Sequence, residues 1–315
     1  MIDWQPSASI ATLQQRAHIL HQIRQFFHER AIMEVETPLL CQHTVTDPYI
    51  DSFAIADHQP PYYLQTSPEY AMKRLLAAGS GPIYQISKAF RQEEQGSLHN
   101  PEFTLLEWYR PGFTHLDLID EIDTLLQTLI QSKPAQKITY HDLFDTHFAI
   151  NPHTCSLESL HQCVAKHINA PSLNSLNRDD CLNLLLTHVI EPTLGIQSPT
   201  FIYDYPASQA ALAQIRKGSP SVAERFELYI NGIELANGFH ELQDADEQYH
   251  RFQQDLQNRQ QLNKALPKID QRFITALQAG LPACSGVALG IDRLIMLASK
   301  HSTVNSAICF DWQHC

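Results

Sequence analysis

The sequence predicts an α+β protein in which mostly antiparallel strands are flanked by helices. The clearest indication is the pair Asn231-Gly232 between two apolar runs, because both positions of a two-residue hairpin turn require residues that tolerate positive φ. A second pair of strand-like runs, residues 83–87 and 103–108, flanks a polar loop and indicates another hairpin. Stretches with helical periodicity lie between these runs, as expected for helices that flank a sheet.

The chain opens with an amphipathic helix, expected over residues 9–30. Apolar residues recur there at helical spacing: Ile10, Leu13, Ala17, Leu20, Ile23 and Phe27. Residues 32–38 then alternate like a strand and stop at Pro38, because proline lacks the N–H that a strand ladder uses.

Two further helices carry start signals in the sequence. Ser67 is expected as an N-cap, with Pro68 at the first helical position, Glu69 in the first turn and Gly79 closing the helix. Thr114 is expected to cap a later helix.

The remaining segments are predicted less uniformly. Residues 133–195 show a weak pattern, with a helical stretch near 179–189, and we expect an insertion packed on the main sheet. A polar helix is expected over 244–264. Residues 286–290 are interpreted as a small-residue turn that opens an apolar helix containing Arg293.

Composition limits the classes of function. A chain of 315 residues with 43% hydrophobic content can bury a sizeable core, and a formal net charge of −12 disfavours non-specific nucleic-acid binding. The chain shows no basic leader and no apolar run long enough to span a bilayer, so a cytoplasmic protein without membrane contact is expected. The 7 cysteines are scattered without a C-x-x-C pair, which favours reduced thiols over disulfides or a zinc site.

Two distant segments indicate nucleotide chemistry. Phe90-Arg91-Gln92-Glu93-Glu94 follows an apolar run, and the stretch from Gly286 to Arg293 combines glycines with a second arginine. The planar fork of arginine suits phosphate oxygens, and glycine lets the backbone approach a nucleotide closely. These segments resemble motifs 2 and 3 of the class II aminoacyl-tRNA synthetases, and the helix and strand that end at Pro38 are similar to motif 1, which forms the dimer interface in that class.

The resemblance is closest to the lysyl-tRNA synthetase branch and covers nearly the whole chain. It implies the class II catalytic fold in one domain, residues 1–315. The matching segments include His99-Asn100-Pro101-Glu102-Phe103-Thr104, Glu107-Trp108-Tyr109, Glu234-Leu235-Ala236-Asn237-Gly238-Phe239 and Gly290-Ile291-Asp292-Arg293.

The resemblance implies a role in ATP binding for residues of all these segments. Arg91 would bind the α-phosphate and His99 the terminal phosphates, with Arg91 and Arg293 as catalytic residues. Glu93 and Asn100 would contact the adenine edge, while Phe103 and Arg293 would enclose its ring, as stacking and cation–π contacts permit. Leu235 and Gly290 are assigned to the same nucleotide site.

Glu234 and Glu241 would hold Mg²⁺, which prefers hard oxygen ligands. They are an odd number of positions apart, so on an unbroken strand their side chains would point to opposite faces. We expect Asn237-Gly238 to break the strand and to turn both carboxylates toward one site.

The amino-acid pocket is acidic by the same resemblance. Glu69 and Glu241 would meet the two ammonium groups of a diamino acid, and Tyr109 would donate its hydroxyl nearby. Ser67, Pro68 and Ala288 would line the same pocket.

Two departures from lysyl-tRNA synthetases alter the expected function. Fewer than a dozen residues precede the first helix, so an anticodon-binding domain is not expected, and neither is tRNA as a partner. Ala288 stands where the lysyl enzymes carry glycine. Both features are similar to the truncated paralogues known as elongation factor P lysine ligases, which implies a homodimer that activates (R)-β-lysine with ATP and transfers it to a lysine side chain of elongation factor P.

Other hypotheses stay open at this point. The chain would also fit a free-standing lysyl-tRNA synthetase core, an asparagine-synthetase-like amide former, or a non-catalytic paralogue that binds an amino acid. The second of these would need cations in the pocket to hold an aspartate side chain, and a non-catalytic paralogue would be expected to have lost Arg91 or Arg293. The sequence identifies neither the acceptor lysine, nor a general base for the transfer step, nor the role of the insertion.

Overall fold

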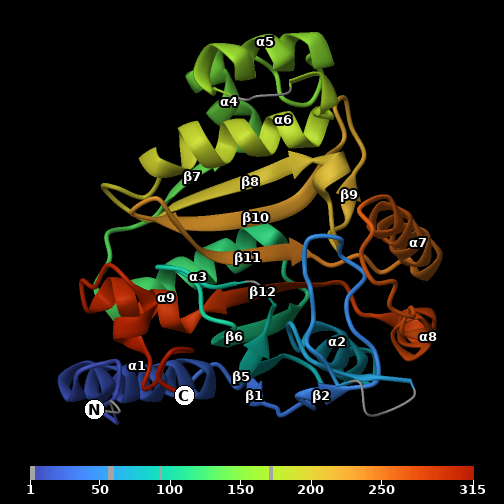
Figure 1. Ribbon diagram of the computed structural model, residues 1–315. Coiled ribbons are helices and arrows are strands. Elements are labelled where there is room, and N and C mark those ends of the chain that lie inside the picture. The colour runs from blue at the N-terminus through green and yellow to red at the C-terminus, as the bar shows by residue number, and fades with distance from the viewer. Residues whose placement is uncertain (1–3, 56–59, 93, 170–172) are drawn as a thin grey trace. The chain divides into compact units, whose positions relative to one another are not determined.

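The computed structural model describes residues 4–55, 60–92, 94–169 and 173–315, which group into two compact units (Figure 1). Unit 1 comprises Met1–Gly112, Gln243–Cys284 and Ala288–Cys315, and unit 2 comprises Phe113–Leu242 and Ser285–Val287. Both units combine helices with mixed, mostly antiparallel strands, so the predicted α+β class is confirmed.

Unit 1 contains the strands of motifs 1, 2 and 3. Its strand order is β1-β5-β6-β12, with β1 parallel to β5 and β5 antiparallel to β6, and a small separate sheet has the order β2-β4-β3. Its elements are α1 (Ile10–His28), β1 (Met33–Glu34), β2 (Leu40–Cys41), β3 (Ala54–Ile55), β4 (Tyr62–Leu64), α2 (Glu69–Ala77), β5 (Ile83–Phe90), β6 (Glu102–Pro111), α7 (Ala245–Gln261), α8 (Gln271–Gly280), most of β12 (Cys284–Gly290) and α9 (Ile291–Ala298).

Unit 2 is built on the order β11-β10-β8-β7, with β9 also paired to β10. Helices α4, α5 and α6 form a layer next to β8, as Figure 1 shows, while α3 contacts β10 and β11. Its elements are α3 (His115–Ile130), β7 (Gln136–Thr139), α4 (Tyr140–Phe148), α5 (Leu157–His167), α6 (Arg178–Leu185) with a π turn (Leu186–Ile190), β8 (Thr200–Pro206), β9 (Ile215–Arg216), β10 (Val222–Ile230) and β11 (Ile233–His240).

Local sequence signals account for most element ends. Ser9 caps α1 by accepting a hydrogen bond from the Thr12 amide at 3.1 Å. Thr114 and Asp117 form a reciprocal capping box at the start of α3. The turn residues Asn231 and Gly232 have φ values of 53° and 72°, so the predicted tight hairpin between β10 and β11 is confirmed.

Two predicted elements differ from the structure. The strand expected over 32–38 is only β1, residues Met33–Glu34, because its one strand partner is the start of β5. Residues 284–290 form strand β12, so the interpretation of 286–290 as a turn is wrong. Close packing next to this strand requires a glycine at position 238 of β11. A Cβ on Gly238 would lie 2.8 Å from the Gly286 carbonyl oxygen and 2.3 Å from the Phe226 ring.

The 133–195 segment is an integral part of unit 2. Its strand β7 pairs in parallel with β8, and its helices share one hydrophobic core with β8 and β10. The buried residues of that core include Leu143, Phe144, Leu182, Leu185, Ile202 and Tyr205. The segment therefore extends the sheet of unit 2 and covers one face of it.

No helix among the residues that the structure describes is long and apolar enough to cross a membrane. The seven cysteines, all within the described ranges, are free thiols.

Candidate active site

Strand β6 presents several predicted site residues on one face. Its ladder with β5 pairs Phe103 with Ala89 and Tyr109 with Ile83. Because side chains alternate along a strand, Phe103, Glu107 and Tyr109 share one face. The nucleotide and amino-acid ends of the predicted site thus follow one strand.

Arg91, the predicted phosphate ligand, lies just after β5. Its guanidinium carbon lies 5.1 Å from the centre of the Phe103 ring, and its Nη1 atom lies 3.4 Å from a Glu94 carboxylate oxygen. The Arg91 Nε atom is buried and has no hydrogen-bond partner among the described residues. A buried cationic donor of this kind suits an anionic ligand such as a phosphate.

Arg293 lies in the first turn of α9 and contacts His99. Its Nη2 donates to His99 Nε2 at 2.7 Å, and its Nε donates to the Leu98 carbonyl at 3.2 Å. Burial lowers the pKa of His99, and the charges of Arg293 and Arg91 lower it further. His99 is therefore neutral at pH 7 and accepts the hydrogen bond from Arg293.

Asn100 has a structural role that the sequence did not indicate. Its Nδ2 donates to the Glu102 carbonyl at 2.7 Å, and its Oδ1 accepts from the Trp312 amide at 2.9 Å. The side chain thus ties the motif 2 loop to the chain's last residues, and an adenine contact would compete with these bonds. Glu93, the other predicted adenine contact, lies outside the described residues.

A buried glutamate, Glu107, contacts two residues of the predicted amino-acid pocket, Ser67 and Tyr109. Its carboxylate accepts from Ser67 Oγ at 2.8 Å and from the Tyr109 hydroxyl at 2.7 Å. Nearby, Lys73 donates to Glu69 at 2.6 Å. Burial, together with the charge of Glu69, raises the pKa of Glu107 to about 7.

Sequence reasoning missed Glu107 and Lys73. The spacing Glu107-Trp108-Tyr109 places the glutamate on the same strand face as Tyr109, so period-2 alternation was a signal that could have identified it. Lys73 is only 1% exposed, and its position one helical turn after Glu69 places the pair on one side of α2. Glu69 and Lys73 therefore form an ion pair next to Glu107.

The other predicted residues of unit 1 lie at the start of α2, in β12 and at the start of α9. Helix α2 begins at Glu69, so the N-cap position belongs to Pro68 and the prediction of Ser67 as N-cap was one residue early. The Ser67 hydroxyl still accepts from the Glu69 amide at 3.1 Å. Ala288 lies half-buried in β12, and Gly290 is the N-cap of α9.

The predicted metal ligands belong to unit 2. Strand β11 runs unbroken through Asn237-Gly238, so the predicted break is wrong. Instead the register shifts, because Leu228 pairs with Ala236 while Tyr229 pairs with Glu234.

This shift leaves Leu235 as an extra, bulged residue, and it reverses the alternation of faces. Glu234 therefore shares a face with Asn237. Glu241 lies four positions beyond Asn237, and an even spacing along extended backbone places it on this same face. The bulge, and not a break in the strand, thus places Glu234 and Glu241 on one face.

The donor set on this face fits Mg²⁺. Glu241 is 1% exposed, and the Oδ1 atom of Asn237 is buried without a hydrogen-bond partner among the described residues. Mg²⁺ is commonly held by one or two carboxylates together with substrate phosphates. No group of three or more His, Cys, Asp or Glu side chains suited to a metal occurs in the described ranges, so phosphate oxygens would have to complete the shell.

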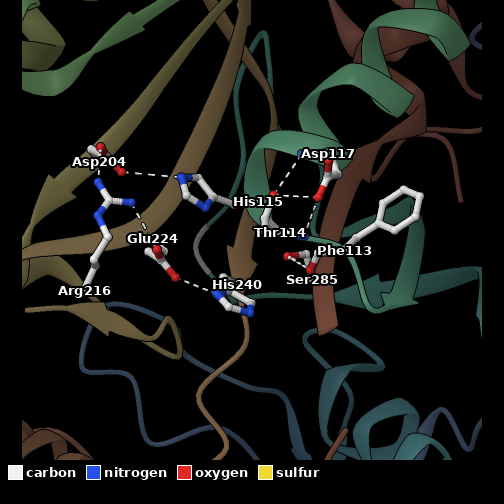
Figure 2. A network of polar contacts seen from close by, with 9 residues as sticks. All are labelled: Phe113, Thr114, His115, Asp117, Asp204, Arg216, Glu224, His240 and Ser285. Carbon is white, nitrogen blue, oxygen red and sulfur yellow. Dashed lines mark hydrogen bonds and ion pairs between the residues drawn. The ribbon is translucent and has the colours of Figure 1, made fainter. Parts of the chain in front are cut away.

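The opposite face of the β10–β11 hairpin carries a different polar network (Figure 2). His240 Nδ1 contacts Glu224, which also accepts from Arg216 at 3.0 Å. Arg216 in turn contacts Asp204, whose carboxylate lies 3.4 Å from His115 of α3. His240 therefore points away from the face of Glu234 and Asn237.

A cavity of about 530 Å³ in unit 1 lies away from Phe103. It is lined by Lys88, Phe90 and Glu102, which alternate with Ala89 and Phe103 and so face the other side of the hairpin. Asn100 also lines this cavity, whereas Arg91, Phe103 and Arg293 do not.

The predicted residues fall into two groups. Those that belong to unit 1 are Ser67, Pro68, Glu69, Arg91, His99, Asn100, Phe103, Tyr109, Ala288, Gly290 and Arg293. Those in unit 2 are Glu234, Leu235 and Glu241.

Known proteins match this chain over almost its full length. A protein of Pseudoalteromonas translucida (strain TAC 125) named elongation factor P--(R)-beta-lysine ligase is 51% identical, over 98% of this chain and 97% of its own. Proteins with the same name from Haemophilus influenzae (strain PittGG) and Salmonella gallinarum (strain 287/91 / NCTC 13346) are 49% and 50% identical, with the same coverage. Residues 1–313 match the family described as tRNA synthetases class II (D, K and N). The chain therefore belongs to this class II tRNA synthetase family.

Proposed function

We propose that this protein is an ATP-dependent, AMP-forming ligase that activates (R)-β-lysine as an adenylate and transfers it to the ε-amino group of a lysine on elongation factor P. The observation that carries the proposal is the identity of about half of all positions, over 98% of the chain, to proteins of that name. The acidic cluster around Glu69 and Glu107 supports a diamino acid as substrate, because a buried carboxylate pair favours cationic groups.

In the activation step the substrate carboxylate attacks the α-phosphorus of ATP, and pyrophosphate leaves. Arg91 stabilises the negative charge that develops on the phosphoryl oxygens, since its buried Nε lacks a protein acceptor among the described residues. Neutral His99 holds Arg293 in place beside the nucleotide. Bound Mg²⁺ would neutralise charge on the phosphates, and Glu234 and Glu241 are the residues that would hold it.

In the transfer step a neutral amine of the acceptor lysine attacks the mixed anhydride and displaces AMP. An acyl phosphate anhydride is reactive toward a neutral amine, so the step requires the amine to lose its proton. We assign no general base for this proton.

We further propose a homodimer with one catalytic domain per chain, located in the cytoplasm and without tRNA as a partner. Large apolar side chains of the motif 1 region support the dimer: Met33, Leu39 and Leu40 are 49%, 41% and 49% exposed. Light scattering at micromolar concentration is expected to give twice the chain mass, and a monomer mass would contradict this part of the proposal.

Intact-mass spectrometry of acceptors tests the function. Elongation factor P and total tRNA are each incubated with enzyme, ATP, Mg²⁺ and either β-lysine or α-lysine. Elongation factor P is expected to gain the mass of one lysyl residue, with β-lysine preferred, and an Arg293→Ala variant should give no adduct. Modification of tRNA alone would instead indicate a free-standing lysyl-tRNA synthetase core, and no adenylate with any amino acid would indicate a non-catalytic paralogue.

A further inference from the structure

Glu227, in the middle of β10, is a buried carboxylate that no step above uses. It is 6% exposed and is the Cα partner of Asn237 on β11. Its Oε2 accepts from the hydroxyls of Tyr205 at 2.7 Å and Tyr229 at 2.6 Å. Its Oε1 contacts Arg225 and lies 3.5 Å from Asn237 Nδ2. Both carboxylate oxygens therefore have partners, and Oε1 faces Asn237 on strand β11.

The contact with Glu227 determines how the Asn237 amide is turned. An ionised carboxylate only accepts hydrogen bonds, so the side of Asn237 that faces Glu227 must be its NH₂ group. The Oδ1 atom then points the other way, and it is buried without a hydrogen-bond partner in the described part of the chain. A buried unpaired carbonyl is unfavourable unless a ligand completes it.

Arg225 forms an ion pair with Glu227. Burial opposes the charge of Arg225, but the neighbouring Glu227 carboxylate raises the pKa of the guanidinium well above its usual range. Arg225 also lies 4.7 Å above the Tyr205 ring and donates to the Gln209 carbonyl at 3.0 Å. The paired carboxylate therefore faces Asn237 Nδ2 as a hydrogen-bond acceptor.

The 133–195 segment closes the other side of this cluster. Tyr140 of α4 is fully buried with its ring 4.8 Å from Tyr205, and Glu191 lies 3.2 Å from the Tyr229 hydroxyl. Burial and the charge of Glu227 raise the pKa of Glu191. The segment thus excludes water from Glu227 and from both tyrosine hydroxyls.

We propose that Glu227 is a positioning residue that fixes the side-chain amide of Asn237 with its carbonyl oxygen directed toward the bound ligand, and that the 133–195 segment maintains this arrangement. The ligand group is cationic, because the same face carries Glu234. An ammonium group of the amino acid and Mg²⁺ share this chemistry, and the experiment separates them. The consequence for activity rests on the proposed function, whereas the effect on the Asn237 amide does not.

The first measurement follows the side-chain amide of Asn237 by NMR in ligand-free protein with ¹⁵N-labelled asparagine, assigned from its loss in Asn237→Ala. In wild-type protein one pair of amide signals with slow solvent exchange is expected. In Glu227→Gln a second pair or at least tenfold faster exchange is expected, because a glutamine amide can face Asn237 with either its oxygen or its nitrogen. The matched control is Glu224→Gln, the same change on the same strand but on the opposite face, which should leave the signals unchanged.

Unchanged Asn237 signals in a folded Glu227→Gln protein would overturn the proposal, whatever reaction the protein catalyses. If Glu227→Gln does not fold, Tyr229→Phe removes one donor from the same carboxylate and is judged by the same signals. The circular dichroism spectrum of each variant shows whether it is folded.

The second measurement determines KM for β-lysine and for Mg²⁺ in adenylate formation. Glu227→Gln should raise one of these two KM values about tenfold in the wild-type background. In the Asn237→Ala background the increase should be less than twofold, because an effect that acts through Asn237 vanishes when Asn237 is absent. The constant that rises identifies the ligand as the ammonium group or the metal. Equal effects in both backgrounds would mean that Glu227 has only a structural role. If the wild-type protein forms no adenylate while the NMR result holds, the proposed function fails and the positioning role stands.

Discussion

Glu224 and Glu227 lie on the same strand, yet they face opposite sides of the sheet and have different surroundings. Glu224 contacts Arg216, whose side chain is 47% exposed, and His240, so its network reaches solvent (Figure 2). Glu227 is enclosed by Arg225 and two tyrosine hydroxyls. An ion pair open to solvent is screened and easily replaced, whereas a sealed one leaves an uncompensated charge when one partner is removed. The face that carries Asn237 is thus held by the rigid network.

The largest difference is expected in stability. Glu227→Ala leaves Arg225 buried and unpaired, and it should lower the free energy of unfolding by about 3–5 kcal/mol. Glu224→Ala should lower it by about 1 kcal/mol or less, because Arg216 can turn to solvent. Urea unfolding followed by circular dichroism measures both values. Equal losses in the two variants would remove the distinction between the two networks.

Glu107 is a third carboxylate for comparison, and it is buried. Its hydrogen-bond donors, Ser67 and Tyr109, are neutral, and Glu69 lies nearby. Its pKa, raised to about 7, means that it is neutral below pH 7 and charged above. A cationic amino acid binds the charged form, so KM for β-lysine should fall about tenfold between pH 6 and pH 8. Glu107→Gln should flatten this profile and raise KM at pH 8. A wild-type KM that does not change over this range would place Glu107 outside the amino-acid pocket.

Ala288 tests whether selectivity depends on shape or on charge, since the carboxylates attract both lysine isomers. Replacement of Ala288 by glycine removes one methyl group, and kcat/KM for α-lysine relative to β-lysine should rise about tenfold, which corresponds to roughly 1.4 kcal/mol. Adenylate formation is measured side by side with the two isomers. An unchanged ratio would place selectivity elsewhere, and Ser67, bonded to Glu107, would be the next residue to change.

The smallest effect is expected from the acid titration of Glu224. Burial opposes its ionisation, but the hydrogen bonds from His240 and Arg216 hold its pKa below the usual range. A depressed pKa in the folded state contributes stability above the unfolded pKa, and this contribution is lost as the pH falls through the folded pKa. The gap in unfolding free energy between wild type and Glu224→Gln should therefore be about 1 kcal/mol or less at pH 7 and should shrink below about pH 4. Urea unfolding at several pH values measures it, and a gap that widens toward low pH would contradict the assignment.

Short-range patterns in the sequence were sufficient for much of the fold. The cap at Thr114 and the hairpin at Asn231-Gly232 depend only on residues a few positions apart, and both were predicted correctly. The family was also evident from the sequence, because the arginine and glycine motifs occur in the right order over nearly the whole chain. Arg91, Phe103 and Arg293 could be nominated without a structure for the same reason.

The predictions that failed depended on partners distant in the sequence. Residues 284–290 form a strand because neighbouring strands supply hydrogen bonds that no local pattern reveals. Glu234 and Asn237 share a face through a bulge at Leu235, and a bulge is visible only when the register of both strands is known.

The properties of the site that the sequence alone could not determine are those that depend on burial. The sequence determined which residue types are available: arginines, which suit phosphate, and glutamates, which suit ammonium groups and metal ions. Only the tertiary structure decided that Glu107 is buried with a pKa of about 7, that Asn100 binds the end of the chain, and that Glu227 is sealed by the 133–195 segment. The physical reason is that the pKa of a carboxyl group and the orientation of an amide depend on solvent exclusion and on donors brought together from separate elements.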